Sequence, residues 1–226
     1  MTVEKFNFYQ NPPYMTMSRF EYNNHFNLQK EKRVSIMCRP ISEIRGKSAN
    51  YLLELSGQQQ SIPVDVKALL RKLKISCMPY DFSTIEAALN ADEDISRDIH
   101  ILGALATNGD RAAIYCRKED EEGGHRYRFT IAHELGHCCL AHFPIDGATV
   151  HYVFRMDDES TDPKEIAANI FAGELLIPQD SLENVIKELL LPDVQTLADI
   201  FAVSRNVMLA RLKYLNISKN IVGYNY

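Results

Sequence analysis

Three ionisable residues, His133, Glu134 and His137, stand inside the apolar stretch "RYRFTIAHELGHCCLAH" at residues 126–142. Ionisable side chains are rarely buried without a partner. On a helix, residues four positions apart share one face with Cβ atoms about 5–6 Å apart, close enough for two imidazoles to bind one Zn²⁺ at about 2.0–2.1 Å. The spacing therefore predicts a metal site carried by a single helix.

Glu134 supplies the chemistry that a purely structural metal site would not need. A helix turns by about 100° per residue, so this side chain projects beside the metal instead of onto it. There it can take a proton from a zinc-bound water, whose pKa is about 7. The pattern H-E-x-x-H thus indicates hydrolysis, with Glu134 as general base and with His133 and His137 as ligands. The alternative is a chance match on an ordinary amphipathic helix.

A catalytic zinc ion takes three protein ligands and keeps a fourth position open. The extended pattern with a third histidine fails, because Leu140 and Phe143 occupy its glycine and histidine positions. His142 lies about 140° around a continuing helix from His137 and is interpreted as a surface or core histidine. The third ligand must therefore come from another part of the chain.

Glu165 is the stronger candidate for the third ligand. It opens "EIAANIFAGELLIP", a second helix whose apolar residues, Ile166 among them, can pack against the first. Asn169, one turn further on, could hold the carboxylate by a hydrogen bond. An alternative role is a capping box, in which Asp162 caps the helix and Glu165 occupies its third position. Other acidic or imidazole competitors are Asp157, Asp158, Glu159 and His151.

The elements that must carry these residues follow from apolar periodicity, caps and turn residues. A β-hairpin is predicted around Asn108-Gly109, just before the metal-site helix, because this dipeptide is a strong hairpin signal. A strand is predicted within residues 74–82. The other expected helices are one ending near Gly57, one capped by Ser61 with Pro63 in its first turn, one from Asp162 to Pro178, one over 181–190 and two within 193–215.

The composition is that of a folded protein, with 226 residues, 46% of them hydrophobic and 24% charged. The net charge of −5 disfavours a surface built for nucleic acid. No apolar run reaches the roughly 18 residues of a membrane helix, and the N-terminus does not resemble a signal peptide, so a cytoplasmic location is expected. The five cysteines lack C-x-x-C spacing and fit reduced thiols, with Cys138 and Cys139 packing in the core.

Three segments in order, "RFTIAHELGHCCLAH", "EIAANIFAGELLIP" and "LADIFAVSRNVMLARLKYL", resemble the ImmA/IrrE metallo-endopeptidase family. The resemblance covers roughly residues 41–215. It implies one Zn²⁺ per chain, held by His133, His137 and Glu165, with Glu134 as catalytic base. It also implies an α+β fold with a zincin-like core, in which a small sheet with a hairpin lies beside the active-site helix, and a helical C-terminal segment like a helix-turn-helix.

The expected organisation has three parts. Residues 1–48 are an accessory arm without regular periodicity, residues 49–190 form the metallopeptidase domain, and residues 191–226 form the helical C-terminal segment. In that segment Ser204 is expected to cap a helix that carries the basic residues Arg205, Arg211 and Lys213. These side chains would face DNA in a DNA-binding protein, but packing or contact with a protein substrate is favoured for the segment.

The resemblance implies a zinc endopeptidase that cleaves a helix-turn-helix transcriptional repressor and so regulates a phage, another mobile element or a stress response. The alternative is a DNA- or protein-binding regulator, or a toxin–antitoxin component, with a non-catalytic metal site. No membrane partner is expected. An oxyanion needs a further donor, for which the candidates are Tyr127, His142, His151 and Tyr152.

Overall fold

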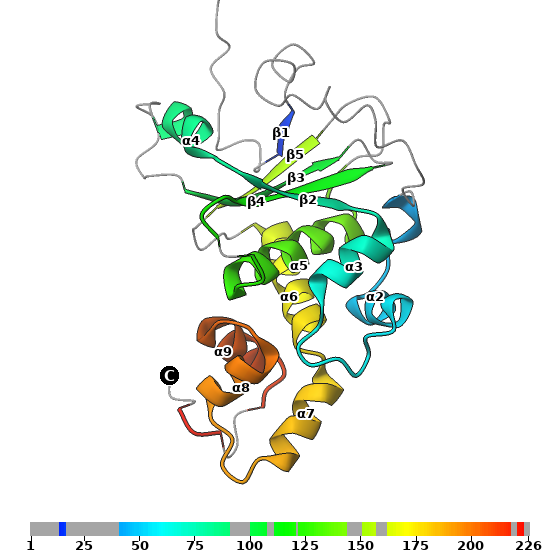
Figure 1. Cartoon of the computed structure of the whole chain (residues 1–226), viewed down its shortest axis with the longest axis vertical. Helices are drawn as coiled ribbons and strands as arrows, with labels where there is room; N and C mark the ends of the chain where they lie inside the picture. The colour runs from blue at the N-terminus through cyan, green and yellow to red at the C-terminus, as the bar shows by residue number, and fades with distance from the viewer. Residues whose placement is uncertain are drawn as a thin grey trace, which may run out of the picture.

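A computed structural model of the chain describes residues 14–16, 41–90, 100–107, 111–120, 122–143, 151–156, 162–217 and 221–223. In Figure 1 a twisted sheet forms one layer, and helices α3, α5 and α6 pack beneath it. The C-terminal helices α7, α8 and α9 lie at the end of the molecule farthest from the sheet. This is the mixed α+β architecture predicted from the sequence. No helix among the described residues has the length and apolar character needed to cross a bilayer.

The sheet has five strands in the order β1-β5-β3-β4-β2. The hairpin of β3 and β4 is confirmed, with Thr107 opposite Ala112, while Asn108-Gly109 itself lies outside the described residues. Strand β2 runs parallel to β4, and the other neighbours are antiparallel. The strand bounds are Tyr14–Thr16 (β1), Ser76–Tyr80 (β2), Ile101–Thr107 (β3), Ala112–Arg117 (β4) and His151–Met156 (β5).

The first and fifth strands were not predicted. β1 lies within the segment expected to be an accessory arm, and it pairs with β5, which follows the metal-site helix in the chain. The rest of residues 1–40 lies outside the described part of the structure. Since β5 also pairs with β3, the two unpredicted strands extend the sheet on the side opposite β2.

Caps and turns explain where the helices begin and end. Gly57 ends α2 in the left-handed conformation with φ 69°, as the sequence predicts. The expected cap of the next helix at Ser61 is wrong, because Asp65 accepts a hydrogen bond from the Ala68 amide at 2.9 Å and starts α3. The helix bounds are Ile41–Glu43 (η2, a 3-10 turn), Ala49–Ser56 (α2), Val66–Leu73 (α3), Ser83–Asn90 (α4), His125–Cys139 (α5), Pro163–Leu176 (α6), Gln179–Glu188 (α7), Val194–Phe201 (α8) and Arg205–Tyr214 (α9).

Hydrogen bonds from one buried arginine connect α5 to the segments next to α3 and α8. The guanidinium of Arg128 donates to the carbonyl of Ala202 at 2.9 Å and to that of Val64 at 2.8 Å. A buried charge that is fully hydrogen-bonded avoids the large cost of an unpaired one. Arg128 therefore fixes the position of α5 against the start of α3 and the end of α8.

Cys138 and Cys139 at the end of α5 are fully buried in the hydrophobic core, as expected from packing. Cys77 on β2 and Cys116 on β4 are also free thiols, with their sulfur atoms 3.4 Å apart. The described cysteines therefore contribute to packing and lie in no metal-binding group that the described residues form.

The C-terminal helices pack as a small bundle against the core. Ser204 caps α9, its hydroxyl accepting from the Val207 amide at 3.3 Å, as predicted. Of the basic side chains expected on a DNA-binding face, Arg211 is only 6% exposed and donates to the carbonyl of Ile177. It is therefore not placed to contact a phosphate. The fully buried residues of this bundle include Leu197, Phe201, Met208 and Leu212.

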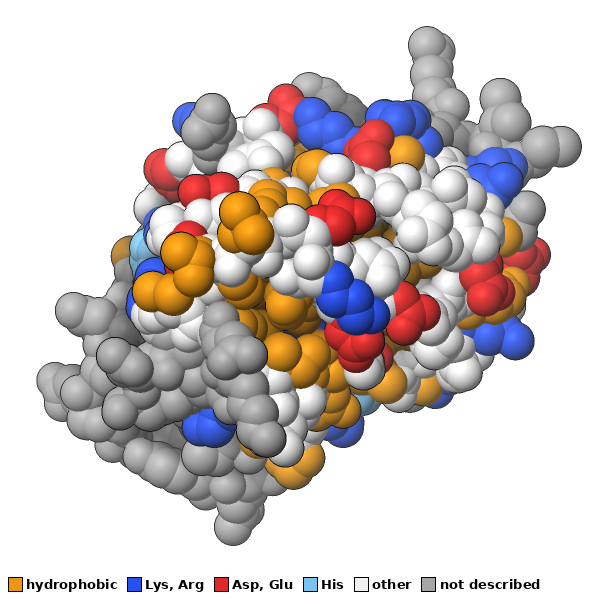
Figure 2. Space-filling model, turned by 90° about the horizontal axis from the view of Figure 1, so that it is seen from below, with side chains coloured by type: hydrophobic (Ala, Val, Ile, Leu, Met, Phe, Trp, Pro, Cys, Tyr) orange, Lys and Arg blue, Asp and Glu red, His pale blue; other side chains and the backbone are white. Residues whose placement is uncertain are grey.

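Hydrophobic side chains gather on the end of the molecule that the C-terminal helices form, as Figure 2 shows from below. The large exposed ones in this part of the chain are Leu190, Leu191, Tyr214 and Val222. A pocket between α8 and the segment 221–223 opens near them and is lined by Leu191, Val194, Arg205 and Val222, among others.

Gly103 on β3 lets the metal-site helix lie close to the sheet. A Cβ at this position would lie 2.3 Å from the Thr130 methyl of α5 and 3.2 Å from the Tyr115 carbonyl. We expect Gly103→Ala to lower the free energy of unfolding by about 1–3 kcal/mol, as overpacking does in buried sites. Urea unfolding followed by circular dichroism measures the change.

The matched control for Gly103→Ala is Thr130→Ser, which removes the clashing methyl group and keeps the hydroxyl. The double variant should lose less stability than the sum of the two single losses, because contacting residues do not behave additively. Strict additivity would show that the loss arises elsewhere in the strand.

Candidate metal centre

The close approach of α5 and α6 builds the site. Gly136 faces α6, and a Cβ there would lie 3.2 Å from both the Ala168 carbonyl oxygen and the Phe171 Cβ. A larger side chain would push the two helices apart. The crossing at Gly136 brings the first turn of α6, with Glu165, against the imidazoles of α5.

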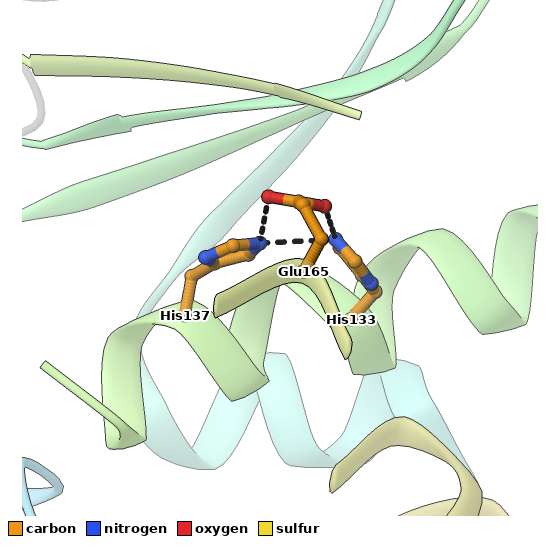
Figure 3. Close-up of side chains that lie close together, drawn as sticks. All are labelled: His133, His137 and Glu165. Carbon is orange, nitrogen blue, oxygen red and sulfur yellow. Dashed lines mark hydrogen bonds and ion pairs between the residues drawn. The ribbon is translucent and has the colours of Figure 1, made fainter. Parts of the chain in front are cut away.

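His133, His137 and Glu165 converge into one group, shown in Figure 3. Their facing atoms form a small triangle: His133 Nε2 lies 3.1 Å from Glu165 Oε2, His137 Nε2 lies 3.2 Å from Glu165 Oε1, and the two Nε2 atoms are 3.0 Å apart. The side chains are 1%, 0% and 8% exposed, respectively. The two helices thus bring together the three residues proposed as ligands on sequence grounds.

This donor set fits a metal ion such as zinc. Two imidazole nitrogens and one carboxylate are a known ligand set of catalytic zinc, with bonds of about 2.0–2.2 Å. Tetrahedral angles at such bonds place neighbouring ligand atoms about 3.3 Å apart, and the distances in this group are 3.0–3.2 Å. Within the described residues, no other group of histidine, cysteine, aspartate and glutamate side chains meets this geometry.

The capping alternative for Glu165 is resolved by the neighbouring aspartate. Asp162 caps α6 alone, since its Oδ1 accepts from the Lys164 amide at 2.8 Å. The carboxylate of Glu165 is turned to the imidazoles instead of the helix end. Ile166 does not pack against α5 as expected and is 45% exposed, whereas Phe171 is buried at the crossing. The helix is capped without using Glu165.

The electrostatics of the group favour an ionised Glu165. Burial by itself would raise the pKa of this carboxyl group, but hydrogen bonds and charge interactions from His133 and His137 hold it well below its ordinary value. A carboxylate that is ionised throughout the physiological range is available to a cation without first losing a proton.

Asn169 orients the first imidazole. The Nδ1–H of His133 donates to the Asn169 amide oxygen at 2.9 Å. A histidine that binds a metal through Nε2 carries its proton on Nδ1, so this hydrogen bond selects the tautomer required for binding. The sequence singled out Asn169 as an outer hydrogen-bond partner, but its contact is with His133 and not with the carboxylate of Glu165.

His142 lies against the imidazole of His137, whereas its spacing in the sequence predicted a surface or core histidine without a role in the site. Its Nδ1 is 3.0 Å from Nδ1 of His137. Burial, followed by the neighbouring His137, lowers the pKa of His142 to about 4. The ring is therefore neutral near pH 7 and lies behind His137, and its role as an oxyanion donor stays a prediction.

Glu134 is completely buried on the side of α5 that faces the sheet. Its Oε1 atom lies 3.7 Å from the position that a Cβ would take on Gly103 of β3. Burial raises the pKa of the Cys138 thiol, and the nearby Glu134 charge adds to that rise. The carboxylate is thus one residue along the helix from His133 and screened from bulk water.

Among the described side chains, none of the remaining candidates joins the group. Tyr127 is half-buried, and its pKa is raised by burial and by a hydrogen bond with Cys77 of β2. His151 and Tyr152 lie on β5 opposite Thr107 and Ala106, and their side chains are outside the described part of the structure. Also outside it are Asp157, Asp158 and Glu159.

Zinc affinity should decrease as the pH falls from 8 to 5. Both imidazoles must be neutral to bind, so protons compete with the metal at these two groups. Because the pKa of Glu165 is lowered, its carboxylate stays ionised above its ordinary value of about 4.3 and adds no proton competition in this range. Chelator competition at several pH values measures the slope.

The variant Glu165→Gln is the control for this pH dependence. It should bind zinc more weakly at every pH, and its affinity should still fall as the pH is lowered. Complete loss of the pH dependence in the variant would show that the competing proton binds Glu165 and not the imidazoles.

Residues 119–213 match the family model of the IrrE N-terminal-like domain, the peptidase M78 family. The match begins just before α5 and ends within α9, so it includes all three residues of the group. It confirms, over this part of the chain, the resemblance drawn from the three sequence segments. The comparison with curated proteins gives no match.

Proposed function

We propose, on the premise that residues 119–213 are similar to the ImmA/IrrE metallopeptidases, that this chain is a zinc-dependent endopeptidase. His133, His137 and Glu165 would hold the metal, and Glu134 would act as the general base. The observation that carries the proposal is the buried triangle of two imidazole nitrogens and one carboxylate, with separations of 3.0–3.2 Å, on a helix that also bears Glu134.

The bound zinc would supply a Lewis acid that polarises the substrate carbonyl and lowers the pKa of water. Glu134 takes a proton from the attacking water and returns it to the amide nitrogen of the leaving group. Its complete burial beside β3 supports this role, because the protein and not bulk water holds the carboxylate in place. Asn169 keeps His133 in the tautomer that the site requires.

The substrate we propose is a helix-turn-helix transcriptional repressor, whose cleavage in the cytoplasm would release a mobile element or a stress response from repression. This part of the proposal rests on the family resemblance. A regulatory peptidase of this kind needs few substrates, so recognition would depend on surfaces outside the metal group. The alternative, a regulator with a metal that does no chemistry, predicts zinc binding without cleavage.

Coexpression with candidate repressors tests the proposed activity. A repressor that is a substrate should be recovered as two fragments whose masses define one peptide bond. Cleavage by the purified chain should stop when a chelator removes the metal and return when zinc is added. Zinc binding with no fragment from any repressor tested would favour the regulator, and a chain that takes up no zinc would exclude both.

A further inference from the structure

The end of α5 reverses the chain so that His142 returns to the helix it has just left. Leu140 ends the helix, and Ala141 adopts the left-handed conformation with φ 61°. The His142 amide then donates to the His137 carbonyl at 3.2 Å, the six-residue hydrogen bond of a Schellman motif. In this motif the residue after the left-handed position packs back on the third residue from the helix end, which is His137.

The reversal places one imidazole directly behind another. The rings of His137 and His142 have centroids 4.9 Å apart and planes inclined at 72°. At 3.0 Å, their Nδ1 atoms are at hydrogen-bond distance. One of the two nitrogens must carry a hydrogen and the other must accept it, because two lone pairs or two hydrogens facing each other at this distance would repel.

The proposed metal site determines which of the two Nδ1 atoms is the donor in this hydrogen bond. Nε2 of His137 faces Glu165 and His133, so its lone pair is the one available to a metal. The hydrogen of neutral His137 then lies on Nδ1 and points to His142. His142 must accept through Nδ1 and carry its own hydrogen on Nε2.

We propose that His142 is a positioning residue for the metal site: by accepting the Nδ1–H of His137, it fixes the ring and the tautomer that present Nε2 to the metal. This inference rests on the proposed zinc site. It gives His137 the same kind of support that Asn169 gives His133. The two supports come from different elements, one from the turn after α5 and the other from α6.

Two substitutions distinguish the effect of losing the hydrogen bond from the effect of changing the volume of the side chain at residue 142. His142→Asn places an oxygen acceptor where Nδ1 stands, whereas His142→Phe keeps the bulk of the ring without an acceptor. His125→Ala, which removes an exposed histidine at the other end of α5, is the control. We expect His142→Phe to weaken zinc binding by about 10–100-fold, the usual cost of losing an outer partner of a ligating histidine. His142→Asn and His125→Ala should stay near the wild type.

Two measurements on the full chain do not depend on peptidase activity. Competition with a chromophoric chelator gives the zinc affinity. In ¹⁵N-histidine-labelled zinc protein, ¹H–¹⁵N spectra report the Nδ1–H of His137, which should give a sharp downfield signal protected from exchange with water in the wild type and in His142→Asn. In His142→Phe, where the Nδ1–H has no acceptor, this signal should shift upfield and broaden through exchange with water.

Equal zinc affinity and an unchanged His137 Nδ1–H signal in His142→Phe would overturn the inference, as would a loss in His142→Asn as large as that in His142→Phe. If His142→Phe does not fold, His142→Ala replaces it in the comparison with His142→Asn. A wild-type chain that binds no zinc would refute the proposed function itself. Zinc binding that is unaffected by substitutions of His142 would refute only the inference about His142.

Discussion

Glu134→Gln is expected to lower the rate of peptide hydrolysis by about 10²–10⁴-fold, the usual contribution of a general base. Glutamine has nearly the same shape as glutamate, so the fully buried site beside β3 should keep its packing. Glu134 is not in the triangle of proposed ligands, so the variant should retain zinc. Cleavage assays and metal analysis on the same preparation measure the two quantities together.

The control for this substitution is Glu188→Gln at the exposed end of α7, which makes the same chemical change far from the site. It should leave both cleavage and zinc content unaltered. Full activity in Glu134→Gln would reject Glu134 as the base, and loss of zinc in that variant would mean that the carboxylate supports the metal instead of the proton transfer.

Glu165→Ala is expected to produce the largest loss of zinc affinity among non-histidine substitutions. It deletes one of three ligands, so the loss should exceed the about 10–100-fold that follows removal of an outer hydrogen-bond partner. It also leaves His133 and His137 without the carboxylate that their Nε2 atoms face at 3.1 and 3.2 Å. Metal analysis after dialysis against a weak chelator should find the variant depleted and the wild type with one zinc per chain.

Asp162→Ala separates metal binding from helix capping. Loss of this cap should lower stability by about 0.5–2 kcal/mol and leave the zinc affinity nearly unchanged, since Asp162 bonds the backbone of α6. Stoichiometric, tightly held zinc in Glu165→Ala would remove Glu165 from the ligand set. Equal zinc loss in both variants would indicate that the fold of the first turn of α6, and not the carboxylate, is what matters.

Much of the helical architecture was predictable because helix ends are local events. Gly57, Asp162 and Ser204 occupy the cap positions that their residue types favour. The error at Ser61 has a local cause too, because Asp65 is also a good cap and lies directly before the apolar run. The strands β1 and β5 were missed because their stability depends on pairing with each other and with β3, far away in the chain.

The sequence alone was enough to predict the pair His133 and His137, because the helical repeat places residues four apart on one face whatever the rest of the fold does. It also determined that Glu134 lies beside that face. Residue types and spacing left open whether Glu165 caps its helix or meets the imidazoles. The close crossing of α5 and α6 at Gly136 brings its carboxylate to the imidazoles.

The position of His142 was likewise decided by folding and not by its spacing from His137. If α5 continued, His142 would point away from the ligands. Instead, Ala141 adopts a left-handed conformation, which is uncommon for an alanine. The periodicity of one helix depends on residues that are close together in the chain, so it can be recognised in the sequence. Helix crossings and chain reversals arise from packing between distant residues, and they place Glu165 and His142 around the two histidines.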